Sequence, residues 1–117
     1  MPDKPFKTFE RETAELIGGK RFPANSGAAL DCEGPTAVAQ CKLVKRLSLE
    51  ELTQLAETVA AQGAEKGKVG LVAVKVRRGS GHPSPGLVVM TFEQFVQMGR
   101  VAAFHYATQL CEQETKL

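Results

Sequence analysis

The chain has no tryptophan, a single tyrosine and only three cysteines among its 117 residues. The cysteines (Cys32, Cys41 and Cys111) form no C-x-x-C pair, and His82 and His105 are isolated. A zinc site is therefore not expected. An odd and scattered set of cysteines is typical of reduced thiols in a cytoplasmic protein.

The sequence also lacks a long apolar run and a strong net charge. No stretch of about 18 apolar residues is present, so no membrane-spanning helix is predicted. The first five residues, Met-Pro-Asp-Lys-Pro, do not resemble the apolar segment of a secretory signal. A net charge of +2 does not by itself require a nucleic-acid partner. We expect a cytoplasmic protein without membrane contact.

Length and composition predict one domain over residues 1–117 with a single modest core. Helical and extended patterns follow one another along the chain without an internal repeat. This order favours an α/β (α+β) fold, in which helices flank a mixed central β-sheet. The expected elements are helices at about 5–17, 48–63 (or 67) and 91–113, and strands at about 28–33, 37–44, 69–76 and 86–90.

Two of the expected helices have clear start signals. Ser48 is predicted to cap the middle helix, with Glu51 at the capping-box position, and Thr91 to cap the last helix. A break of the last helix near Gly99 is one alternative. An apolar stripe is expected to line one side of the last helix. Its members are Phe92, Phe95, Val96, Ala102, Ala103, Tyr106 and Leu110. Val101 and Phe104 lie off the stripe, which indicates a second apolar face that another copy of the chain would cover.

The first expected helix carries a carboxylate on its apolar side. Glu10 lies four residues before Ala14 and seven before Ile17, so the three side chains share one side of the helix. A carboxylate in an apolar setting is costly without a partner. Glu10 is therefore predicted to be a cap, a member of an ion pair or a metal ligand.

A strand, a turn and a second strand follow at residues 28–44. Asp31 lies at the end of a short apolar stretch, and the alternation of side chains along 37–44 places Gln40 and Lys42 on one face. Phosphodiester hydrolysis needs an activated water and neutralisation of the phosphate, which Mg²⁺ can supply from a set of oxygen ligands. Glu10, Asp31, Gln40 and the backbone carbonyl of Cys41 would provide that set. Lys42 would orient or deprotonate the attacking water.

This pattern, Glu…Asp…(Glu/Gln)-x-Lys, resembles the PD-(D/E)xK restriction-endonuclease-like nucleases. More narrowly, residues 9–14 (FERETA), 23–27 (PANSG), Asp31 and 40–42 (QCK) are similar to the archaeal-type Holliday junction resolvases and their phage relatives, over about residues 6–98. The resemblance implies a restriction-endonuclease-like fold and a homodimer that cuts four-way DNA junctions with Mg²⁺ or Mn²⁺. It also implies that Ser26 contributes to activity and DNA contact.

The chain departs from this family at one position. Gln40 stands where an acid is usual, and a neutral amide should weaken metal binding. Glu33, two residues after Asp31, is a candidate to compensate. Basic residues cluster near the predicted site, although each cluster taken singly is more typical of a solvated surface. The residues expected to contact DNA are Lys20, Arg21, Ser26, Lys45, Arg46, Arg77 and Arg78.

The sequence leaves several functions open besides junction resolution. A related nuclease acting on flaps, nicks or ordinary duplex would carry the same residues. A DNA-binding module that has lost catalysis is a third interpretation, and Gln40 is its main support. A small structural α/β protein without a nucleic-acid partner is the fourth, favoured by the low net charge.

Overall fold

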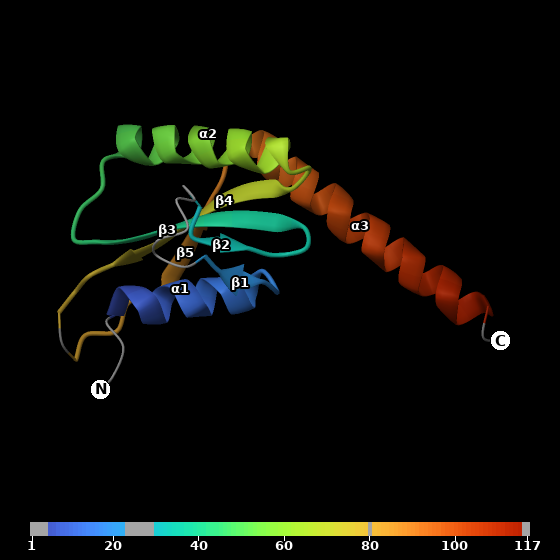
Figure 1. Ribbon diagram of the computed structural model, residues 1–117, viewed down its shortest axis with the longest axis horizontal. Helices are drawn as coiled ribbons and strands as arrows, with labels where there is room; N and C mark the ends of the chain where they lie inside the picture. The colour runs from blue at the N-terminus through green and yellow to red at the C-terminus, as the bar shows by residue number, and fades with distance from the viewer. Residues whose placement is uncertain (1–4, 23–29, 80, 116–117) are drawn as a thin grey trace.

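The computed structural model describes residues 5–22, 30–79 and 81–115 (Figure 1). Within these ranges the chain forms an α/β fold with a five-stranded mixed sheet packed against helices, which confirms the predicted class. None of the described helices combines the length and apolar character of a membrane span. In chain order the elements are α1 (Pro5–Leu16), β1 (Lys20–Arg21), β2 (Cys32–Glu33), β3 (Ala37–Val44), α2 (Leu49–Glu65), β4 (Val69–Val76), β5 (Gly86–Val89) and α3 (Phe92–Thr115).

The strands lie in the sheet in the order in which they occur in the chain, β1-β2-β3-β4-β5. Strands β3 and β4 are parallel, with Ala37 opposite Val69 and Val44 opposite Val76, and α2 makes the crossover between them. The other neighbouring pairs are antiparallel. Six consecutive residues from Val69 to Val74 are buried, as expected for a strand that is covered on both faces.

Helices α1 and α2 cover opposite faces of the sheet (Figure 1). This follows from the alternation of side chains along β3 and β4. One core cluster packs beneath α1 and contains Phe9, Ala14, Cys32, Ala37, Ala39, Cys41, Val69, Leu71 and Ala73. The other packs beneath α2 and contains Leu30, Val38, Ala56, Val59, Val72 and Val74.

The predicted start of α2 is confirmed, because the Ser48 hydroxyl accepts a hydrogen bond from the Glu51 N–H at 3.1 Å. The helix ends at Glu65, and Gly67 follows with a φ of +68°. Of the two expected ends, Gly67 is therefore correct. Gly63 lies inside the helix, where its missing side chain allows β4 to approach closely.

Helix α3 has the predicted cap, since the Thr91 hydroxyl accepts a hydrogen bond from the Gln94 N–H at 3.2 Å. The helix is continuous through Gly99, so the alternative of a break there is wrong. Its far end extends beyond the sheet (Figure 1). Within the apolar stripe, the side chains of Ala102, Ala103 and Tyr106 are not described. Phe92, Phe95 and Val96, at the start of the helix, are exposed.

The start of this stripe is exposed in the structure. Phe92 is 93% exposed and Phe95 is 70% exposed. The side chains that meet the sheet are instead Gln94 and Met98. Gln94 accepts a hydrogen bond from the backbone N–H of Gly70 at 2.9 Å, and Met98 packs against the core beneath α1. This polar anchor rotates the apolar stripe away from the sheet.

The strand expected at 28–33 is shorter in the structure. Only Cys32 and Glu33 have strand geometry, and residues 28–29 lie outside the described ranges. Asp31 nevertheless runs beside β3, because its N–H donates to the Ala39 carbonyl at 3.0 Å. Among the described residues, regular pairing of β2 with β3 therefore begins directly after an acidic side chain.

Gly70 is predicted to be essential for the close packing of α2 on β4. A Cβ at this position would lie 2.0 Å from the Val59 carbonyl oxygen, so Gly70→Ala would force the helix away and should destabilise the fold by about 1–3 kcal/mol. Gly99 has no described atom within 4 Å of such a Cβ, so Gly99→Ala should stabilise α3 by up to about 1 kcal/mol. Urea unfolding of both variants measures this difference. Equal stabilities would contradict the packing.

Candidate functional site

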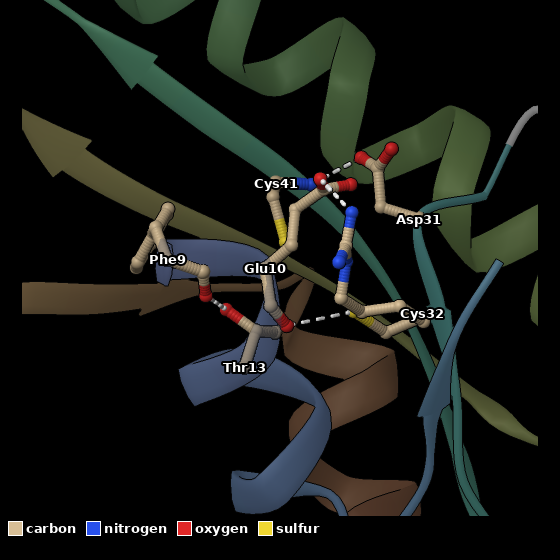
Figure 2. Close-up of polar contacts among 7 residues, drawn as sticks. Phe9, Glu10, Thr13, Asp31, Cys32 and Cys41 are labelled. Atoms are coloured by element: carbon tan, nitrogen blue, oxygen red, sulfur yellow. Dashed lines mark hydrogen bonds and ion pairs between the residues drawn. The ribbon is translucent and has the colours of Figure 1, made fainter. Parts of the chain in front are cut away.

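Helix α1 holds Glu10 against the sheet. Phe9 and Ala14 are buried on the same side of the helix, and Glu10 itself is only 6% exposed. Its backbone carbonyl accepts a hydrogen bond from the Cys32 thiol at 3.3 Å, which ties α1 to β2 (Figure 2). The prediction that Glu10 points toward the apolar side is confirmed.

Asp31 is fixed by the backbone of the neighbouring strand. Its Oδ2 accepts a hydrogen bond from the Cys41 N–H at 2.7 Å (Figure 2). The Asp31 side chain thus makes the hydrogen bond that a strand partner would make to this N–H. In an extended strand the N–H and C=O of one residue point to the same side. The Cys41 carbonyl, a predicted metal ligand, therefore points to the side of β3 on which Asp31 lies.

The structure brings the carboxylates of Glu10 and Asp31 together. Burial of Glu10 raises the pKa of its carboxyl, and the neighbouring Asp31 carboxylate raises that pKa further. Arg21 acts in the opposite direction, with its Nη2 3.3 Å from Glu10 Oε1. Two like charges in contact are unfavourable unless a cation or a proton lies between them. In the structure the Arg21 guanidinium is the cation beside this pair.

Gln40 and Lys42 share one face of β3, and both side chains are partly buried. The antiparallel register that places Cys32 opposite Ala39 places the Asp31 backbone opposite Gln40. Val38, on the same face, packs beneath α2, and Lys42 lines a cavity with α2 residues. The Gln40 and Lys42 side chains therefore lie on the α2 face of the sheet, whereas Glu10 belongs to α1 on the other face. Ser26 lies outside the described residues.

The donor set at this edge fits a hard divalent cation. It offers carboxylate oxygens from Glu10 and Asp31 and the backbone carbonyl of Cys41, which are oxygen ligands of the kind Mg²⁺ prefers. Within the described residues, no group of three or more Asp, Glu, His and Cys side chains could hold a metal. Metal binding here would therefore depend on backbone oxygen and water as well as on the two acids.

Glu33 does not join the carboxylate pair, so its predicted compensating role is not supported. Its Oε1 pairs with Lys66 Nζ at 2.7 Å, and its Oε2 pairs with Lys68 Nζ. These hydrogen bonds lower the pKa of the Glu33 carboxyl. Glu33 therefore joins β2 to the turn between α2 and β4.

Two buried thiols lie directly behind the site. Cys32 and Cys41 are 0% and 2% exposed and are not joined by a disulfide. The contact with Cys41, together with burial, raises the pKa of the Cys32 thiol, which stays protonated. Sequence patterns do not predict this contact, because Cys32 and Cys41 lie on different strands and meet only through the pairing of β2 with β3.

The predicted DNA-binding residues fall in two places. Lys20 and Arg21 lie on β1, at the edge of the sheet beside the carboxylates. Lys45, Arg46, Arg77 and Arg78 lie where the parallel strands β3 and β4 end, since the Arg77 N–H donates to the Val44 carbonyl at 2.8 Å. A cavity of about 620 Å³ at that end is lined by side chains that include Lys45, Lys75, Arg77, Arg78 and His82.

Comparison with models of protein families, with curated proteins and with solved structures finds no match for this chain. The function of this chain is therefore inferred from its residues and their geometry.

The Glu33 ion pairs predict a pH-dependent contribution to stability. The folded pKa of Glu33 is lowered from the unfolded value of about 4.3, so the pairs stabilise the fold above that pH. This stability is lost as the pH falls through the lowered folded pKa. Glu33→Gln should reduce the melting temperature at about pH 7 and have little effect at about pH 2.5. Glu57→Gln, which removes an exposed carboxylate on α2, is the control. A Glu33→Gln effect that does not change with pH would contradict the assignment.

Proposed function

We propose that this chain is a metal-dependent DNA endonuclease with a restriction-endonuclease-like fold, and that it resolves four-way junctions. The main support for the proposal is the contact between the Glu10 and Asp31 carboxyl groups beside β3, where the Cys41 N–H holds Asp31 in place. Residues far apart in the sequence converge there, in the order that the resolvase-like pattern requires. Few structural roles explain a buried acid placed against a second acid.

The residues around the pair have distinct roles in the proposed hydrolysis. Glu10, Asp31 and the Cys41 carbonyl would hold Mg²⁺, which when bound supplies a more acidic water and positive charge beside the phosphate. Asp31 keeps the Cys41 peptide in place. Lys42 orients the attacking water, takes part in its proton transfer and stabilises the charge that develops on the phosphate.

The basic residues support a polyanionic substrate. Lys45, Arg77 and Arg78 line one cavity at the ends of β3 and β4, and no acidic residue lines it. Lys20 and Arg21 lie at the β1 edge, on the other side of the carboxylate pair. A DNA backbone that follows these cations would pass the metal ligands, and its affinity would fall steeply with added salt.

A symmetric pair of subunits would place two such sites on opposing strands of a junction. The structure leaves an apolar groove of about 540 Å³ between the end of α1, β5 and α3, lined by residues that include Leu16, Ile17, Leu71, Val88, Met90 and Phe95. It is continuous with the exposed stripe of α3 through Phe95. Exposed apolar area that extends over two elements is typical of an interface. A second copy of this chain is the proposed occupant, because each copy offers both a projecting apolar helix and a groove at its base.

Cleavage of a synthetic four-way junction tests the enzymatic proposal. With Mg²⁺ the full-length protein should cut two opposing strands. Asp31→Asn, which keeps the shape but removes the charge, should slow cleavage by about a hundredfold or more. Glu15→Gln, which neutralises an exposed acid on the same helix as Glu10, is the control and should cut normally. Equal cutting by Asp31→Asn and wild type, or no cutting with either Mg²⁺ or Mn²⁺, would reject the proposal.

Two alternatives share this fold and surface. A related nuclease would cut flaps or linear duplex at least as fast as junctions, so the three substrates are compared side by side. A module that has lost catalysis would bind junctions tightly without cutting them, and Gln40 favours this interpretation. The latter also predicts that metal ions leave the melting temperature unchanged.

The proposed dimer predicts a different response to charge at two exposed apolar positions. Phe95→Glu places a carboxylate in the groove and should shift the protein from dimer to monomer in light scattering, with little loss of fold because Phe95 is 70% exposed. Leu49→Glu is the matched control, since Leu49 is 79% exposed at the start of α2. A wild-type protein that stays monomeric at high concentration would contradict the dimer.

A further inference from the structure

We infer that Arg21 is the resident cation of the carboxylate pair in the metal-free protein, and that a divalent ion must displace it from Glu10 in order to bind. This inference rests on the proposed metal site and assigns to it a regulating residue. It makes Arg21 a positioning residue that competes with the metal. The sequence suggested only that Arg21 contacts DNA.

The ion pair between Arg21 and Glu10 has the geometry of a contact that can be exchanged. A single pair of atoms, Arg21 Nη2 and Glu10 Oε1, lies within ion-pair distance, at 3.3 Å. Strong arginine–carboxylate pairs are usually bidentate and shorter, at about 2.7–2.9 Å. The Arg21 Nε is buried and has no hydrogen-bond partner among the described residues. The guanidinium thus neutralises Glu10 while its buried Nε–H stays without a partner among the described residues.

The position of Arg21 leaves room for its side chain to move. It is the last residue of the two-residue edge strand β1, and its side chain is 26% exposed, compared with 8% for Glu10. Arg21 also lines a cavity of about 560 Å³ together with Gly18, Gly19, Phe22 and Glu33. A guanidinium that leaves Glu10 can therefore turn into this cavity, where solvent and the Glu33 carboxylate are within reach.

Competition follows from the chemistry of the shared oxygen. A divalent ion bound between Glu10 and Asp31 would occupy the space beside Glu10 Oε1 that the guanidinium now fills. Two cations cannot share that space, so binding of the metal and contact with Arg21 exclude each other. The free energy of the ion pair then opposes metal binding, and removal of the guanidinium should raise metal affinity.

The experiment measures binding of Mg²⁺ and Mn²⁺ to the full-length protein by calorimetry and by thermal melting, without DNA. Arg21→Gln should lower the melting temperature in EDTA, because the carboxylate pair loses its cation. It should also raise the affinity for Mg²⁺ by about fivefold or more. Arg21→Lys, which keeps a positive charge, should fold like wild type and should bind Mg²⁺ with an affinity between those of wild type and Arg21→Gln.

Lys20→Gln is the matched control. It removes one positive charge from the adjacent residue of β1, which is exposed and has no described contact with Glu10. It should leave both the metal-free melting temperature and the metal affinity unchanged. If Lys20→Gln raised the affinity as much as Arg21→Gln, a general charge effect would explain the result and the inference would be wrong.

The outcomes separate this inference from the proposed function. If wild type binds Mg²⁺ or Mn²⁺, Asp31→Asn does not, and Arg21→Gln binds the metal as weakly as wild type or more weakly, then Arg21 does not compete and only the inference fails. If neither metal binds wild type or changes its melting temperature, the metal site itself is rejected, and the inference is rejected with it.

Discussion

The organisation of this edge of the protein depends on one unfavourable contact, that between the carboxylates of Glu10 and Asp31. Like charges brought together away from water repel each other, so the surrounding structure must hold them in place. The Cys41 N–H fixes Asp31, and the packing of α1 fixes Glu10. Arg21 supplies a positive charge beside Glu10. Each of these contacts comes from a different element, and so the site exists only in the complete fold.

The sheet contributes by the place at which β2 begins. Strand β2 consists of Cys32 and Glu33, and the Asp31 side chain, directly before it, accepts the hydrogen bond from the Cys41 N–H. A backbone N–H that bonds a carboxylate instead of a carbonyl holds a charged side chain against the strand. The register of β2 on β3 therefore builds the site as directly as the acids do.

Local patterns predicted most of the elements and part of the site. Strands β3 and β4, the Ser48 cap and the inward position of Glu10 all follow from periodicity and capping signals in neighbouring residues. The contact between Arg21 and Glu10 could not be predicted, because a two-residue strand has no periodicity to identify its partner. The helix that carries the apolar stripe, α3, was predicted correctly. Periodicity does not say what covers a face, and the Gln94 anchor turned it outward.

Gln40 and Arg21 together suggest how the site balances stability against metal affinity. Two carboxylates and one guanidinium leave a net charge of about −1, whereas an acid at position 40 would add a further negative charge to this part of the sheet. The amide thus lowers the repulsion that the metal-free protein must tolerate. In the proposed reaction the same substitution removes attraction for Mg²⁺, and Arg21 opposes binding further. A site of this kind would favour a metal that arrives with the DNA phosphate, since the phosphate supplies the missing negative charge and offers the displaced guanidinium a new partner.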